Sequence, residues 1–415
     1  VFFFGALGCT FSPNIWVLYF FRIVLGFAVG GASATVPVFL GETAPKRIRG
    51  TLVAVDQMMI VFGQFLAYSM NAALAQHHGG PAVRVAGGEE QQWDVVRNVI
   101  DLSTVTGGNG MTWRYMLVLA SLPAIALWIG IRLMPESSRW YVAKERLHDA
   151  IGALKRVREE AEDGPLVDEM LEMVEARQHE LAEEARRRGL GYVWRTPWLR
   201  KLLLVGVFLA IVNQTTGVNT VMYYAPKVLE YAGMSTSASI TAQVANGVMS
   251  VIGSAIGIWL IMRFRRRQIL IADVTGVGVC LLGIAATFQL AIAGHMSAGT
   301  TPPAWAAFLI LGLMAVFMLI VQSSNGTVVW TMMGEIFPAN VRGVMNGTAI
   351  FCMWVANAAI TWTFPRMMES LGGGATYAVY GVLNIVIALV LLKVMPETSG
   401  RSLEQIERDM ERRYS

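Results

Sequence analysis

Charged residues are scarce in this sequence. Asp, Glu, Lys and Arg make up 15% of the 415 residues, whereas 54% are hydrophobic and the mean hydropathy is +0.50. Because a soluble domain carries about 25% charged residues, this composition excludes an ordinary soluble protein and predicts a membrane protein with many spans. The three cysteines, Cys9, Cys280 and Cys352, fall inside apolar stretches. That placement predicts buried small side chains rather than a disulfide framework or a zinc site.

Signatures of bond-making chemistry are also lacking. No phosphate-binding loop follows a strand, and no cluster of His, Cys and carboxylates has metal-ligand spacing. The pair His77-His78 is expected to be solvated, and the series Gly26, Gly30, Gly31 allows close helix packing rather than nucleotide binding. We therefore expect no enzyme activity, no cofactor, no metal and no nucleic-acid partner.

Long apolar stretches are what the sequence has in abundance. A helix needs roughly 20 apolar residues to cross a bilayer, and the stretches of about that length or more are 15–40, 51–76, 114–134, 201–230, 239–262, 269–294, 303–333, 343–365 and 375–395. They are expected to be helices because backbone N–H and C=O groups in lipid must form their hydrogen bonds within the segment. The opening VFFFGALGCTF is too short to span and lacks an initiator Met and a basic signal region. We interpret 1–12 as part of one further helix.

The distribution of Lys and Arg predicts which loops lie in the cytoplasm. The loops rich in these residues fall on one side if each span crosses once; they are 41–50, 135–200, 263–267, 334–343 and the C-terminal tail. The opposite loops hold few basic residues; they are 77–113, 231–238, 295–302 and 366–374. We therefore place the first set in the cytoplasm.

Two pairs of matching motifs indicate an internal duplication. GETAPKRIRG at 41–50 is matched by GEIFPANVRG at 334–343, and MPESSR at 134–139 by MPETSGR at 395–401. Parallel six-helix repeats are a known transporter design. The first copy carries an outer-loop insertion at 77–112 and, by symmetry, lacks two and a half helices at its start. We therefore expect the chain to be a fragment.

This duplication predicts four segments. They are an N-terminal helix bundle (1–134, lacking its first two and a half helices), a cytoplasmic helical linker (135–200), a C-terminal six-helix bundle (201–395) and a cytoplasmic tail (396–415). The linker is expected because 141–190 is charged, rich in helix formers and interrupted by Gly164-Pro165.

At this point the sequence resembles the sugar porters of the major facilitator superfamily. The resemblance covers nearly the whole chain and rests on RIVLGFAVGGASATVPVFLGETAPKRIRG, PESSRW, NQTTGVNTVMYYAP, GEIFPANVRG and PETSGRSLEQIE, in the family's order. It implies an all-α membrane protein with twelve helices in two six-helix bundles, of which about nine and a half are present here. It also implies a central sugar site and alternating access.

A cytoplasmic gate is implied by the twin motif, because carboxylates and guanidinium groups at facing bundle ends can pair and separate. Its expected members are Glu42, Arg49, Glu136, Arg266, Glu335, Arg342 and Glu397. The alternative is loop charge held only by positive-inside topology. The sequence departs from the family at 262–267, MRFRRR, where an acid and a glycine are lost, which weakens this part of the gate.

The resemblance also implies a sugar site of amides and aromatic rings. Its expected members are Gln57, Gln64, Asn213, Gln214, Asn219, Tyr223, Tyr224, Trp330, Trp354 and Asn357. Gly217 is expected to loosen its helix. The alternative for the amides is hydrogen bonding between helices, and for the tryptophans an interfacial belt. Family residues are replaced at Asn213, Ser250, Gly326-Thr327 and Met353, which leaves the sugar undetermined.

Charges inside the spans suggest coupling to protons. Arg22 matches an Arg that pairs with a first-helix Asp in proton-coupled family members, and Asp56 is a second intramembrane acid. The alternatives are an Arg22 side chain extending to the outer surface and an Asp56 in a hydrated inner mouth. Asp273 lies similarly near the start of its span, and we assign it to the hydrated mouth.

Together these features predict a multi-pass porter of the bacterial inner (plasma) membrane that carries a sugar or polyol with a proton. We expect a monomer whose partners are the small-molecule sugar or polyol, the proton and the lipid bilayer. The alternatives are a facilitative uniporter and, in a different class, a non-transporting sugar sensor, which the short tail ending at Ser415 disfavours. A drug or organic-acid exporter would need fewer amides.

Overall fold

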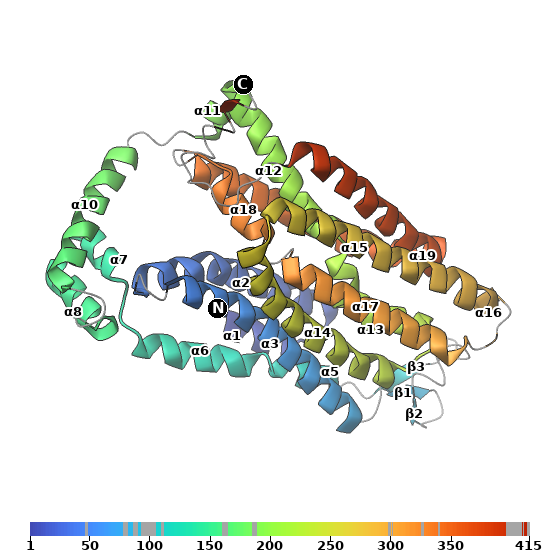
Figure 1. Cartoon of the computed structure of the whole chain (residues 1–415). Helices are drawn as coiled ribbons and strands as arrows, with labels where there is room; N and C mark the ends of the chain where they lie inside the picture. Colours follow the sequence, from blue (N-terminus) through green and yellow to red (C-terminus); the bar gives the residue numbers. More distant parts are fainter. Residues whose placement is uncertain are drawn as a thin grey trace. The chain divides into compact units, whose positions relative to one another are not determined.

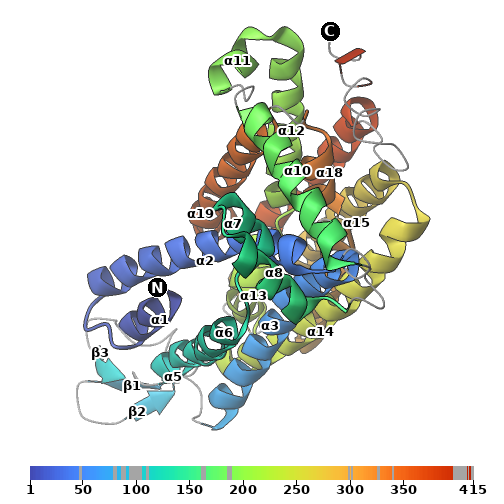
Figure 2. The ribbon, with the colours of Figure 1, turned by 90° about the vertical axis from the view of Figure 1, so that its left-hand side faces the viewer.

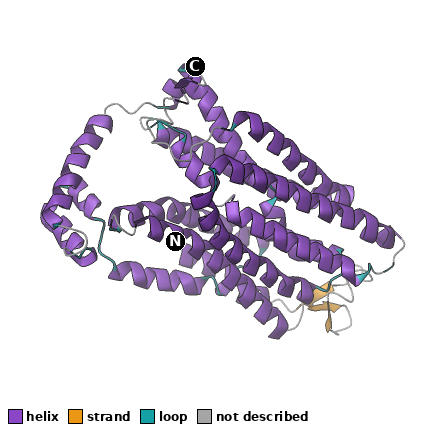
Figure 3. Ribbon diagram, viewed as in Figure 1, coloured by secondary structure: helices purple, strands orange, loops and turns teal. Residues whose placement is uncertain are grey.

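Helices dominate the structure, a computed structural model (Figures 1 and 3). It describes residues 1–45, 49–77, 82–85, 90–92, 105–108, 112–159, 165–184, 189–297, 300, 302–324, 328–338, 341–395, 409 and 411–412. The described chain forms two compact units, and the first comprises Val1–Ile60 and Ala73–Arg186. The second comprises Val61–Ala72 and Arg187–Ser415. Helix α3 (Arg49–His77) contributes its middle to the second unit and its ends to the first.

The first unit begins with α1 (Phe2–Thr10), which packs against α2 (Ile15–Thr43), α5 (Thr112–Val118) and α6 (Ser121–Leu133). Gly8 allows α1 to approach α2 closely, since a Cβ there would lie 2.2 Å from the Phe21 ring. Arg114 on α5 donates to the carbonyls of Thr10 (3.0 Å) and Ser12 (3.1 Å). A guanidinium therefore satisfies carbonyls that the end of α1 leaves free.

Three linker helices complete the first unit and lie together in Figure 2. They are α7 (Ser138–Ala143), α8 (Leu147–Val157) and α10 (Leu166–Glu184). Their small core contains Val142, Ala150, Leu154, Leu166, Met170 and Met173. Ala150, Ala153 and Leu154 on α8 are buried while its charged residues face outward, the pattern of an amphipathic helix on a small core.

A short antiparallel sheet lies within the predicted outer-loop insertion. Its strands are β1 (Ala82–Val85), β2 (Glu90–Gln92) and β3 (Val105–Gly108), in the order β2-β1-β3. Ala82 pairs with Gln92 and Val83 with Gly108. The sequence prediction covered the spans and did not anticipate these strands.

The second unit contains the remaining helices. They are α11 (Leu190–Arg195), α12 (Pro197–Thr215), α13 (Val218–Tyr231), α14 (Thr236–Arg263), α15 (Arg266–Thr287), the π-helix η2 (Phe288–Ile292), α16 (Ala293–Ser297), α17 (Ala304–Ser324), α18 (Trp330–Glu335) and α19 (Arg342–Val394). Helix α15 packs on both α17 and α19, and α12 packs on α19.

The spans agree with the prediction except at their joints. Eight helical segments of the described chain are long and apolar enough to cross a membrane. The last of them, α19, unites the predicted spans 343–365 and 375–395, because the helix continues through most of the predicted loop 366–374 and turns only at Gly372 (φ 78°, ψ 166°). The predicted loosening at Gly217 is confirmed: its φ of 81° separates α12 from α13.

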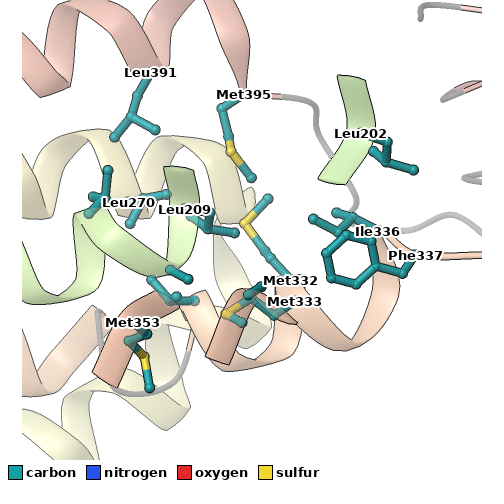
Figure 4. Packing of buried hydrophobic residues seen from close by; sticks show 14 of the residues in the cluster. Leu202, Leu209, Leu270, Met332, Met333, Ile336, Phe337, Met353, Leu391 and Met395 are labelled. Atoms are coloured by element: carbon teal, nitrogen blue, oxygen red, sulfur yellow. The ribbon is translucent and has the colours of Figure 1, made fainter. Parts of the chain in front are cut away.

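The core of the second unit is rich in methionine where α12, α15, α18 and α19 meet (Figure 4). The side chains of Leu209, Leu270, Met332, Met333 and Met353 are buried in this cluster. Gly206 on α12 leaves room for the Phe337 ring, since a Cβ at Gly206 would lie 2.2 Å from it. Flexible thioethers fill irregular space of this kind.

Helices α14 and α17 approach at backbone distance. A Cβ added at Gly253 or Gly257 would lie 2.5 Å from the Leu319 carbonyl oxygen or 2.4 Å from that of Ser323. Small residues four apart on one face are a common device for close packing in membranes. Gly253 and Gly257 therefore hold α17 closely against α14, near the N-terminal part of α15.

Candidate functional site

A cluster of buried amides surrounds Gln214 in the second unit. Asn213, Gln214 and Asn219 are all buried. Gln214 Nε2 donates to Asn213 Oδ1 (2.6 Å), and Asn219 Nδ2 donates to Gln214 Oε1 (2.7 Å). Asn219 can reach Gln214 because the chain turns at Gly217 in a conformation that glycine adopts without strain. The break that separates α12 from α13 thus builds the cluster.

Helix α19 adds a third wall to this cluster. Asn357 Nδ2 donates to the same Gln214 oxygen (3.1 Å), and the Thr361 hydroxyl donates to Asn357 Oδ1 (3.3 Å). Tyr224 on α13 then donates to the Thr361 carbonyl (2.9 Å). Four of the predicted sugar-site residues, Asn213, Gln214, Asn219 and Asn357, are therefore joined in one hydrogen-bonded group on three helices.

A second polar chain runs from α3 through α13 to α14. Gln64 Nε2 contacts the Tyr68 hydroxyl (2.8 Å), which donates to the Met222 carbonyl (3.2 Å). Gln243 Nε2 donates to the same carbonyl (3.4 Å), and Asn246 Nδ2 donates to Gln243 Oε1 (2.6 Å). The residues Val61–Ala72 belong to the second unit, so this chain lies within one unit.

Sequence reasoning missed Tyr68, Thr361, Gln243 and Asn246. A signal for the last two was present, because Gln243, Asn246 and Ser250 follow one another at intervals of three and four residues, which places them on one helix face. Gln243 and Asn246 are buried, and the Ser250 hydroxyl donates to the Asn246 carbonyl (2.7 Å). Tyr68 lies one turn after Gln64 on α3 and could have been found in the same way.

The predicted aromatic members are placed differently from the amides. Tyr224 is half-buried against the Phe364 ring, with centroids 5.2 Å apart. Tyr223, Trp330 and Trp354 are exposed. Asn357 lies one turn after Trp354 on α19, so the two share a helix face. The assignment of both tryptophans as stacking walls therefore stays a prediction.

Amides and hydroxyls dominate both polar chains, and these groups donate as well as accept hydrogen bonds. That chemistry suits a neutral ligand with many hydroxyls. The described residues include no group of three or more His, Cys, Asp or Glu placed to hold a metal ion.

A family model described as sugar (and other) transporter matches residues 1–410. The chain belongs to this family. Among the sugar transporter's relatives, the major myo-inositol transporter IolT of Bacillus subtilis (strain 168) is 37% identical over 407 residues, which is 98% of this chain and 77% of IolT.

Solved structures show the fold of this sugar transporter. The inward-open conformation of the xylose transporter XylE from E. coli is 25% identical with a TM-score of 0.74, covering 100% of this chain and 80% of that chain. The proton:xylose symporter XylE bound to 6-bromo-6-deoxy-D-glucose is also 25% identical with a TM-score of 0.67, covering 100% of this chain and 81% of that chain. The predicted major facilitator fold is confirmed, and the chain is a multi-pass membrane protein.

The transporter's predicted gate and coupling residues are described in part. Arg342 Nε donates to the Phe337 carbonyl (3.0 Å), and Glu136 Oε1 accepts from the Ser137 backbone (3.1 Å). Arg266 is half-buried at the start of α15, and Arg22 is exposed on α2. The remaining residues predicted for these roles and for the sugar site lie outside the described side chains; they are Glu42, Arg49, Asp56, Gln57, Glu335 and Glu397.

Proposed function

We propose that this transporter carries a sugar or polyol across the membrane by alternating access, as a proton symporter. The observation that carries the proposal is the amide group around Gln214, which joins α12, α13 and α19 through three amide–amide hydrogen bonds. Membership of the sugar transporter family supports the substrate class, and the relative IolT supports polyols within it. The ligand would bind by replacing these amide–amide hydrogen bonds with hydrogen bonds between the amides and its own hydroxyls.

The sugar site in this proposal also takes Gln57, Gln64, Tyr223, Tyr224, Trp330 and Trp354. Hydrogen bonding between helices is the competing role for the amides, because the same contacts hold α12, α13 and α19 together. The two roles differ in one measurable way. A purely structural amide affects stability when removed, whereas a ligand-binding amide affects substrate affinity in a protein that remains folded.

Proton coupling is assigned to Arg22 and Asp56. A charge within a span is costly and is generally retained for function, and the similar protein XylE is a proton:xylose symporter. The gate is assigned to Glu42, Arg49, Glu136, Arg266, Glu335, Arg342 and Glu397, whose acids and bases would pair when the inner side is closed. The competing function is facilitative uniport through the same pathway; a non-transporting sugar sensor is the competitor from another class.

Orientation follows from the basic loops in this proposal. The protein is a monomer in the plasma membrane, with its linker and C-terminal tail in the cytoplasm. The proposal divides the chain into the N-terminal bundle (1–134), the linker (135–200), the C-terminal bundle (201–395) and the tail (396–415).

The decisive experiment is uptake of labelled hexoses, pentoses and inositol by cells that express the protein, with and without a protonophore. We expect saturable uptake of one of these classes and loss of accumulation when the proton gradient is abolished. Uptake that is saturable but unaffected by the protonophore would establish uniport, and the absence of uptake for every compound would contradict the proposal.

A further inference from the structure

Helix α15 carries a buried acid that the sugar pathway does not use. Asp273 is 3% exposed, so the structure corrects its assignment to a hydrated mouth. Neither carboxyl oxygen makes a well-formed hydrogen bond to a described residue, although the Ser324 hydroxyl lies beside the carboxyl. An unpaired buried acid is rare in any protein, and within a membrane span it marks a functional site by default.

The acid borders a cavity between α14, α15 and α17. The cavity holds about 400 Å³ and is lined by Leu260, Phe264, Gln268, Ile269, Ala272, Asp273, Ile320, Ser323 and Ser324. The Ser324 hydroxyl is buried beside the carboxyl and makes no well-formed hydrogen bond to a described residue. The Ser323 hydroxyl already donates to the Ile320 carbonyl (2.8 Å). Close packing of Gly257 on Ser323 fixes this wall of the cavity.

Among the described residues, no base lines the cavity to neutralise Asp273. Helix α17 has no charged residue, and Arg267 on α15 donates instead to the Leu392 carbonyl. Two helices that pack against α15 carry charged or titratable groups: Arg263 lies on α14, and α19 carries Arg342, Cys352, Arg366, Glu369, Tyr377, Tyr380 and Lys393. Besides Asp273, α15 itself carries Arg266, Arg267 and Cys280, and Arg265 immediately precedes it. None of them is among the lining residues.

An ionised Asp273 side chain would be poorly hydrated, and no described residue that lines the cavity would supply a countercharge. Removing a charge from water without a partner is so unfavourable that the group takes up a proton instead. A protonated carboxyl has one O–H donor and free acceptor positions, which the nearby Ser324 and Gln268 can meet.

We propose that Asp273 is a proton-binding site, opened to solvent through the cavity between α14, α15 and α17, and separate from Arg22 and Asp56. The proton adds to the carboxylate to give the neutral acid and is released as the cavity hydrates. The coupling of proton release to sugar movement rests on the proposed symport. The binding of a proton by Asp273 does not depend on it.

Infrared spectroscopy of the protein reconstituted in liposomes tests the binding site directly. We expect a carboxylic-acid C=O band near neutral pH that is lost in Asp273→Asn and shifted in Ser324→Ala. The matched control is Asp149→Asn, because the exposed Asp149 is paired with Arg146 (2.8 Å) and should contribute no such band. A spectrum that Asp273→Asn leaves unchanged would mean an ionised carboxylate and would overturn the proposal.

Transport measurements test the coupling. We expect Asp273→Asn to keep sugar exchange between equal concentrations and to lose uphill accumulation. Accumulation equal to the wild type, in a wild type that a protonophore inhibits, would overturn the coupling role. If the wild type itself ignores the protonophore, the proposed symport fails, and the infrared result still decides whether Asp273 holds a proton.

Discussion

Gln214 is the residue on which the amide cluster depends. Its side-chain oxygen accepts from Asn219 and Asn357, and its nitrogen donates to Asn213. Both acceptor positions of the amide are thereby used, while one N–H remains for another partner. A hydroxyl that both donates and accepts can replace any of these neighbours, which is the property that a sugar site needs.

Replacing Gln214 by Ala should weaken binding of the transported sugar. The change removes the amide that would hydrogen-bond a ligand hydroxyl, and a buried hydroxyl left without that partner in the complex costs about 1–3 kcal/mol. At roughly 1.4 kcal/mol per decade, the dissociation constant for the transported sugar should rise about 10-fold or more. Equilibrium binding to purified protein measures this rise.

The matched control is Gln289→Ala, which removes an exposed amide on η2 in the same unit. It should leave the dissociation constant unchanged. If Gln214→Ala lowers the melting temperature but binds sugar as the wild type does, the amides hold helices together and do not read the ligand.

At the residue scale, the amides could be predicted because polar side chains inside a span need a reason to be there. Asn213, Gln214, Asn219 and Asn357 were assigned to the sugar site because they also match family positions. Their mutual contacts could not be predicted, since they depend on where α19 crosses α12. The burial of Asp273 could not be predicted either. Its position near the start of a span suggested hydration, whereas the packing of α14 and α17 around it buries the side chain.

At the scale of elements, a buried arginine fastens the linker helices to the end of α2. Arg158, just after α8, pairs with Glu169 on α10 through two hydrogen bonds (2.8 and 2.9 Å). The same guanidinium donates to the carbonyls of Thr43 (2.6 Å) and Ala44 (3.3 Å). A cation at a helix C-terminus also complements the helix dipole. One side chain therefore holds three elements of the first unit.

Arg158→Ala should release the end of α2. The Arg158 side chain is 1% exposed and that of Glu169 14%, and removal of one partner from a buried pair costs about 3–5 kcal/mol. Hydrogen exchange at the backbone of residues near Thr43 should accelerate. Arg146→Ala is the control: its pair with Asp149 is exposed on both sides (55% and 42%), and such pairs contribute about 0–1 kcal/mol. Equal exchange in both variants would refute the role of Arg158.

Hydropathy predicted the spans well because burial in lipid requires an uninterrupted apolar helix. It predicted the joints less well. A loop was expected over 366–374, but helix continues until Gly372 alone turns the chain. The strands β1–β3 were missed because three- and four-residue strands in a polar insertion carry no periodic signal long enough to read.

At the scale of the whole molecule, the duplicated motifs and the family's motifs predict the class of fold. Two helix units are what alternating access requires, because the ligand must be reached from one side at a time. In the proposed mechanism, a few side chains of the amide cluster set the chemistry of the transported molecule. Asn213 in this cluster differs from the family pattern, as do Ser250, Gly326-Thr327 and Met353 outside it, so the motifs alone predict a sugar or polyol and no more.

The central claim is that a ligand bound at the Gln214 cluster shifts the two units relative to each other. Its most direct test is the distance between spin labels at two exposed positions, Leu133 at the end of α6 and Met262 at the end of α14, in a background lacking the three native cysteines. Adding the transported sugar should shift the distance distribution in this background and leave it unchanged in Gln214→Ala. A background protein that transports the sugar with an unchanged distance, or a Gln214→Ala protein that responds as the background protein does, would contradict the account.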